Sequence, residues 1–141
     1  MRRQPRLVRA RLARAPSRAL APAMLAATLA ATPAPAADPL TELEAYASEA
    51  GRIVGYLKEC GLYDDAADFE RAGRKLVRLS AGIIGSNARI LVARLESARF
   101  NMTTRDISCE GEAHDARLSR HETARARLMS AMKLHMDDAA E

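Results

Sequence analysis

The chain contains 141 residues, with a formal net charge of +4, 4% aromatic residues, two cysteines and no tryptophan. The excess of positive charge lies in the first 36 residues, which hold seven arginines and no acid, whereas residues 37–141 carry 15 lysines and arginines against 18 acids, a net charge of −3. This balance argues against a nucleic-acid-binding domain. The lack of further cysteines and of a glycine-rich phosphate loop excludes a four-cysteine zinc site and the familiar nucleotide-binding folds.

The first 36 residues have the pattern of a cleavable secretory signal peptide. An arginine-rich head precedes the apolar segment 19–31, and the pattern closes at Ala34-Pro35-Ala36. A bilayer-spanning helix needs about 20 apolar residues, so this segment is too short for a transmembrane anchor. An arginine-rich leader without acids is also typical of a mitochondrial transit peptide, but the 30 alanines, and 19 arginines against 3 lysines, favour a GC-rich bacterial genome. We therefore expect export to the periplasm, cleavage after Ala36 and a single helical domain over residues 37–141.

The first predicted helix covers residues 39–60. Asp38 is a typical N-cap residue, and Pro39 suits the first helical position, where its missing N–H costs nothing. Apolar residues recur at three- and four-residue steps until Gly61, which supplies a left-handed stop. The helix also carries a ridge of small residues at four-residue steps: Ala47, Gly51 and Gly55. This ridge predicts a close crossing with another helix.

A second helix is predicted to end near residue 80. Asp65 and Asp68 resemble a capping box at its start. Phe69, Leu76 and Leu79 continue the helical period of its apolar face. The stretch 80–85 contains two glycines and predicts a turn.

Two further helices are predicted beyond this turn. The third is capped by Ser86 or Asn87, and the fourth covers about 105–136, with Thr104 or Asp106 as its cap. No stretch alternates with period two for long enough to form a strand. Because short connections make successive helices antiparallel neighbours, the pattern predicts an all-α, up-down four-helix bundle with a long C-terminal helix.

Cys60 and Cys109 are expected to form a disulfide. Cys60 is the last residue of the first predicted helix, Cys109 lies in the first turn of the fourth, and antiparallel packing brings these ends together. Disulfides are usual in exported proteins, whereas a redox-active pair usually has Cys-x-x-Cys spacing. We interpret the pair as a structural bridge.

A basic face is predicted on the second helix at helical spacing: Arg71, Arg74, Lys75 and Arg78. Residues 37–70 hold 9 acids and 2 bases, and residues 71–105 hold 8 bases and 1 acid. The interpretation we favour is that the acidic first helix packs against the basic second and third helices. The alternative is a surface for an anionic partner, such as the cell envelope.

The candidate metal ligands share one side of the fourth helix: Met129, Met132, His135 and Met136. Thioether and imidazole ligands suit Cu(I). A methionine stripe at helical spacing is more often a packing surface, which is the interpretation we favour.

The three histidines lie at heptad multiples along the fourth helix. His114 and His121 are separated by about 10 Å, too far for both to hold one metal ion. If these two rings face the apolar side of the helix, desolvation lowers the pKa of each.

The fourth helix is predicted to be longer than its neighbours. Its C-terminal third should then extend past the bundle and present an apolar interaction face: Leu128, Met129, Met132 and Met136. An exposed apolar stripe of this kind is usually a site of interaction with another protein surface. We expect a homodimer or another periplasmic protein as the partner.

These features predict a small exported helical protein that acts by protein–protein interaction, with no cofactor, no nucleic acid and no transmembrane anchor. We expect no enzyme activity, because no Ser/His/Asp set or carboxylate pair can be singled out. In size, helicity and its single cysteine pair the chain resembles small periplasmic acid-stress chaperones, although it carries none of their sequence motifs. The resemblance implies a role in envelope stress. The alternative function is a periplasmic copper-binding protein that uses the Met/His face.

Overall fold

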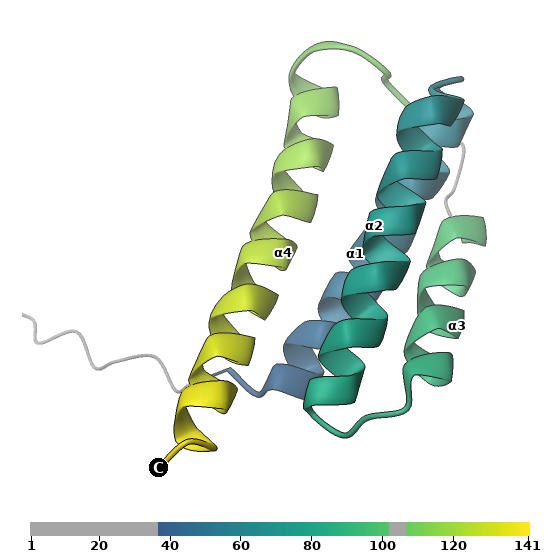
Figure 1. Cartoon of the computed structure of the whole chain (residues 1–141). Helices are drawn as coiled ribbons and strands as arrows, with labels where there is room; N and C mark the ends of the chain where they lie inside the picture. The colour runs from purple at the N-terminus through teal and green to yellow at the C-terminus, as the bar shows by residue number, and fades with distance from the viewer. Residues whose placement is uncertain (1–36, 102–106) are drawn as a thin grey trace, which may run out of the picture. The chain divides into compact units, whose positions relative to one another are not determined.

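The computed structural model describes residues 37–101 and 107–141, which form four α-helices and no strand (Figure 1). The helices are α1 Pro39–Glu59, α2 Tyr63–Ile83, α3 Ala88–Phe100 and α4 Gly111–Asp138. The prediction of an all-α protein is confirmed for this part of the chain. The signal peptide predicted for residues 1–36 lies outside the described residues. None of the described helices is long and apolar enough to cross a membrane.

The starts of α1 and α3 are capped by the side chains that the sequence predicts. Oδ2 of Asp38 accepts a hydrogen bond from the backbone N–H of Thr41 at 2.9 Å. Oδ1 of Asn87 accepts one from the backbone N–H of Arg89 at 3.0 Å. Each side chain satisfies a donor that the first turn of a helix leaves unpaired. After α1, Gly61 adopts a φ of 73°, as its predicted role as a stop requires.

The start of α2 has no side-chain cap. The helix begins at Tyr63, with Leu62 in the N-cap position. The capping box predicted from Asp65 and Asp68 is therefore wrong. Asp65 instead lies in the first turn, where a carboxylate interacts favourably with the positive end of the helix dipole.

The end of α2 lies beyond the predicted one. The helix includes the first four residues of the stretch predicted as a turn and ends at Ile83. Ser80 and Ala81 are buried inside it, and this packing outweighs the low helix propensity of the glycine beside them. The chain turns at Gly85 instead, which has a φ of 69°.

The start of α4 also lies later than predicted. The helix begins at Gly111, and the predicted caps Thr104 and Asp106 lie outside the described residues. Gly111 has a φ of 66°, and a right-handed helix cannot run through a residue in this left-handed conformation. Cys109 therefore lies two residues before α4 and not in its first turn.

α1 is the central helix of the described residues. It packs against α2, α3 and α4, and it supplies half of the buried hydrophobic residues of the core. One buried cluster draws on all four helices, with Leu43, Val77, Leu95 and Leu128 among its members. A second cluster surrounds Tyr56 near the C-terminal end of α1.

α1 and α3 cross closely at Gly51. A Cβ atom at this position would lie 2.8 Å from the Cβ of Ala98 and would overlap the carbonyl oxygen of Leu95. Only a residue without a side chain fits such a contact. The close crossing predicted from the ridge of small residues is confirmed at this position.

A disulfide joins Cys60 to Cys109, as the sequence predicts, with the two Cα atoms 5.6 Å apart. Beside it, the Tyr56 hydroxyl donates a hydrogen bond to the carbonyl oxygen of Ser108 at 2.8 Å. This bond uses the only hydroxyl proton, so in the 2.8 Å contact between Tyr56 and Nδ1 of His114 the imidazole is the donor. The disulfide and the hydrogen bonds together attach the start of α4 to the end of α1.

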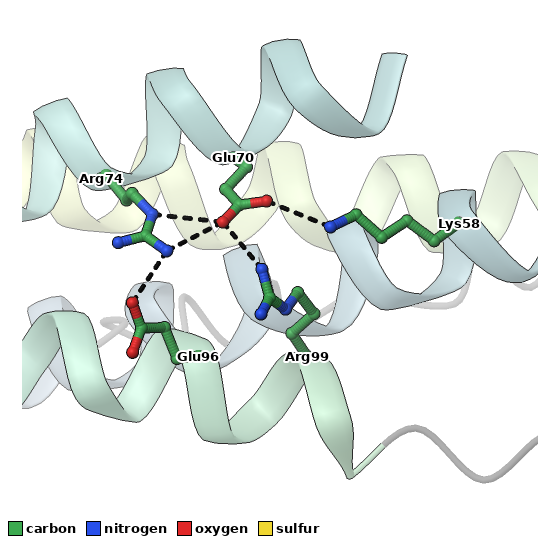
Figure 2. Close-up of polar contacts among 5 residues, drawn as sticks. All are labelled: Lys58, Glu70, Arg74, Glu96 and Arg99. Atoms are coloured by element: carbon green, nitrogen blue, oxygen red, sulfur yellow. Dashed lines mark hydrogen bonds and ion pairs between the residues drawn. The ribbon is translucent and has the colours of Figure 1, made fainter. Parts of the chain in front are cut away.

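Glu70 of α2 lies at the centre of an ion-pair network that joins three helices (Figure 2). Its carboxylate accepts hydrogen bonds from Arg74 at 2.9 Å, Arg99 of α3 at 2.9 Å and Lys58 of α1 at 3.3 Å. Arg74 also pairs with Glu96 of α3 at 2.8 Å. Burial raises the pKa of the Glu70 carboxyl, but the hydrogen bonds from Arg74 and Lys58 outweigh this effect and hold the pKa below its usual value.

Removal of the disulfide is expected to destabilise the protein. The double variant Cys60→Ser, Cys109→Ser opens a loop with a sequence separation of 49, for which the chain-entropy model gives a loss of about 4 kcal/mol. Urea unfolding of the oxidised protein and of the variant measures this difference. Dithiothreitol should lower the midpoint of the natural protein and leave that of the variant unchanged. Equal midpoints before reduction would contradict a stabilising role.

Loss of the central carboxylate of the network should also destabilise the fold. In Glu70→Ala the three cations that it binds lose their shared partner, and we expect a loss of about 1.5–3 kcal/mol in the free energy of unfolding. Asp68→Ala is the matched control, because its ion pair with Arg71 is exposed on both sides and should contribute less than about 1 kcal/mol. Denaturant titration of both variants measures the two losses in the free energy of unfolding. Equal losses would show that the network contributes no more than an exposed ion pair.

Candidate functional site

An open groove of about 530 Å³ lies between α2 and α4. α1 packs against both of these helices, but α2 and α4 do not pack closely against each other, so the space between them stays open. Its lining residues are Tyr46 of α1, then Asp68, Phe69, Ala72, Lys75, Leu76 and Leu79 of α2, and His121, Glu122, Arg125 and Met129 of α4. The volume falls within the usual range of ligand-binding pockets.

Apolar side chains form much of this lining. Phe69, Leu76 and Leu79 stand at helical spacing on α2, and Leu79 is 56% exposed. Met129 of α4 is 51% exposed. The sequence correctly groups the three α2 residues on one apolar face, but the structure leaves part of that face uncovered. Exposed apolar side chains gathered on a concave surface are typical of a binding site.

His121 is the buried polar residue of the groove. It is only 5% exposed, and its ring lies against the rings of Phe69 and Tyr46, with centroids 5.0 and 5.7 Å away. Nδ1 is buried and has no hydrogen-bond partner among the described residues, and Oε1 of Glu122 lies 3.6 Å away from it. A buried polar atom without a partner costs about 1–3 kcal/mol, so a ligand that supplied one would be favoured.

The environment of the groove changes the protonation of two of its groups. Burial lowers the pKa of His121, and the nearby carboxylate of Glu122 only partly opposes this effect. Burial raises the pKa of the Tyr46 phenol. Both groups are therefore neutral at neutral pH, and both can take part in hydrogen bonds within apolar surroundings.

Charged side chains of both signs are found at the edges of the groove. Asp68 pairs with Arg71 at 3.0 Å, and Glu122 lies 3.6 Å from Arg125. Lys75 makes no ion pair with any residue that the structure describes. The groove thus combines an apolar lining with an ammonium group that is available to an anion.

The structure brings together the four residues of the predicted basic face. Arg71, Arg74, Lys75 and Arg78 line a shallow hollow of about 380 Å³ on α2, and Lys75 borders both this hollow and the groove. Arg74 is neutralised by Glu70 and Glu96, and Arg71 is paired with Asp68. Within the described part of the chain, Lys75 and Arg78 are left without ion-pair partners. The expected contact between the acidic first helix and the basic helices occurs at Glu44, which pairs with Arg94 at 3.4 Å.

The predicted interaction face is only partly at the surface. Leu128 and Met132 are 0% and 3% exposed and belong to the core beside α1, so the expectation that they extend past the other helices is wrong. The physical reason is the late start of α4, which places both residues alongside the N-terminal half of α1. Met129 and Met136 are at the surface, and Leu134, which sequence reasoning missed, is exposed to the same extent as Met136.

The candidate metal ligands are divided in the same way. Met132 lies in the core, whereas Met129 and Met136 are exposed and His135 is half-exposed. The part of the chain that the structure describes contains no group of three His, Cys, Asp or Glu side chains placed to share a metal ion.

No protein-family model, curated protein or solved structure matches this chain.

Acid should destabilise the fold through His121. Burial lowers the folded pKa below the unfolded value of about 6.5, so the unfolded chain binds more protons in mild acid. This contribution to stability is fully present above about pH 6.5 and is lost as the pH falls toward the folded pKa. Urea midpoints should therefore fall on acidification. His121→Gln should remove this part of the dependence, and His135→Gln, a change on the same helix, should retain it. A urea midpoint of the natural protein that does not change with pH would contradict this role of His121.

Proposed function

We propose that this is a small exported periplasmic protein that acts by binding another protein and not by catalysis, and that its binding surface is the groove between α2 and α4. The observation that carries the proposal is the open apolar lining, which includes His121, a buried ring whose Nδ1 has no hydrogen-bond partner in the described part of the chain. A ligand that enters the groove removes the exposed apolar side chains of its lining from water.

The shape of the groove favours a helical segment of a partner. Its α2 wall extends from Asp68 to Leu79, a distance of about 16 Å, which corresponds to roughly three turns of a helix. Apolar side chains at helical spacing in such a groove are the usual receptor for the apolar face of an amphipathic helix. The charges at the edges, among them Lys75 and Arg125, would select the orientation of that helix.

The scaffold supports a preformed site. We take the helices to form an up-down four-helix bundle, because successive helices alternate in direction in Figure 1 and α1 contacts the other three. The disulfide and the Glu70 network hold these helices together, so little order has to be gained on binding.

The location and the wider role are proposed on chemical grounds. A disulfide persists in oxidising compartments such as the periplasm. A buried histidine whose lowered pKa makes the stability of the fold depend on pH suits a role in envelope stress. Lys75 and Arg78 favour an anionic partner or envelope surface. No observation among the described residues favours the copper alternative.

The proposal is tested with a labelled synthetic amphipathic peptide that carries leucines at positions i, i+3, i+4 and i+7. Fluorescence anisotropy should show saturable binding to the oxidised protein. Ala72→Trp fills the groove from its own lining and should weaken binding at least about tenfold, equivalent to about 1.4 kcal/mol. Ala126→Trp is the matched control, because Ala126 is an exposed alanine of α4 outside the lining of this groove. Unsaturable binding, or equal binding by both variants, would contradict the proposal.

A further inference from the structure

The C-terminal end of α4 is both apolar and acidic. Leu134 and Met136 are each 48% exposed. They are followed by three exposed acids, Asp137, Asp138 and Glu141. Exposed apolar side chains beside acidic groups give this segment the chemistry of one that docks on a surface with apolar and cationic side chains.

The groove between α2 and α4 offers that complementary chemistry. Leu79 and Met129 expose apolar surface on its two sides. Lys75 of α2 and Arg125 of α4 supply one cation from each side. Lys75 has no ion-pair partner in the described part of the chain, and Arg125 has only a 3.6 Å contact with Glu122, in which both side chains are more than half exposed. Both cations are thus available to an acidic segment.

We propose, on the basis of the function proposed above, that the occupant of this groove is the C-terminal end of α4 from a second copy of the chain. The groove-lining part of α4 extends from His121 to Met129, a length of about 12 Å. The helix beyond Met129 extends to Asp138, a further length of about 14 Å. The segment and the groove therefore match in length as well as in chemistry.

This match sets the geometry of the dimer. The two α4 helices run antiparallel about a twofold axis near residue 131, so that each copy places its C-terminal end in the groove of the other. In this register the partner's Asp137 lies opposite Arg125. The partner's Glu141 lies opposite His121, which borders the same groove. Because the two contacts are identical, the assembly closes at two copies.

Charge reversal on either side of the contact tests the inference by sedimentation. The natural oxidised protein should be a dimer at micromolar concentration. A groove variant, Lys75→Glu with Arg125→Glu, places acids against acids and should weaken dimerisation at least about tenfold. A tail variant, Asp137→Arg with Asp138→Arg, places cations against cations and should have the same effect.

An equimolar mixture of these two variants provides the decisive measurement. The groove variant has an acidic groove and an acidic tail, whereas the tail variant keeps Lys75 and Arg125 in its groove and has a cationic tail. A mixed dimer therefore restores opposite charges at both contacts, and we expect dimers in the mixture although each variant alone is monomeric. The control Arg89→Glu, Arg120→Glu reverses two exposed cations outside the groove and should remain dimeric.

The outcomes separate this inference from the proposed function. A natural protein that is monomeric but still binds the amphipathic peptide would overturn the second copy as occupant and leave the groove as a docking site for other proteins. A dimer that survives both charge variants, or a mixture that stays monomeric, would overturn it as well. Circular dichroism tests whether each variant is folded. If a charge variant is unfolded, Ala72→Trp takes its place, because it blocks the groove without a change of charge.

Discussion

The burial of α1 is the constraint on which the rest of the structure depends. Three helices cover this one helix, and each is attached to it in a different way. α3 crosses it closely at Gly51, α2 is linked to it through Glu70 and Lys58, and α4 is tied to its end by the disulfide. Because α2 and α4 each direct buried side chains toward α1, they do not pack closely against each other. The groove between them is a consequence of this arrangement.

Features set by one side chain or one backbone conformation could be predicted from the sequence. Asp38 and Asn87 cap their helices through bonds to residues two or three positions away, and Gly61 needs only its own left-handed conformation. The late end of α2 could not be predicted, because it depends on the burial of Ser80 and Ala81 against distant residues. The late start of α4 depends on the conformation of Gly111. Because the predicted helix began several residues too early, its residues were expected at the wrong positions along α1.

The site was harder to predict than the fold, for a physical reason. A helical period shows which side chains avoid water but not which neighbouring helix covers them. Val77 and Leu79 are both apolar residues of α2, but Val77 is buried whereas Leu79 borders the open groove. This difference depends on the position of α4. The same holds for charge, since spacing placed four cations on one face but did not reveal that Glu70 and Glu96 neutralise Arg74.

The disulfide also converts part of the chain into a covalent ring. α2 and α3 lie inside the ring between Cys60 and Cys109, while α1 and α4 lie outside it. A single peptide-bond cut within the ring, for example in the turn at Gly85, leaves the two fragments joined through their sulfur atoms. An endoprotease that opens this segment therefore nicks the oxidised molecule without dividing it. The helix that carries His121 stays linked to the helix against which it packs, and only reduction releases them.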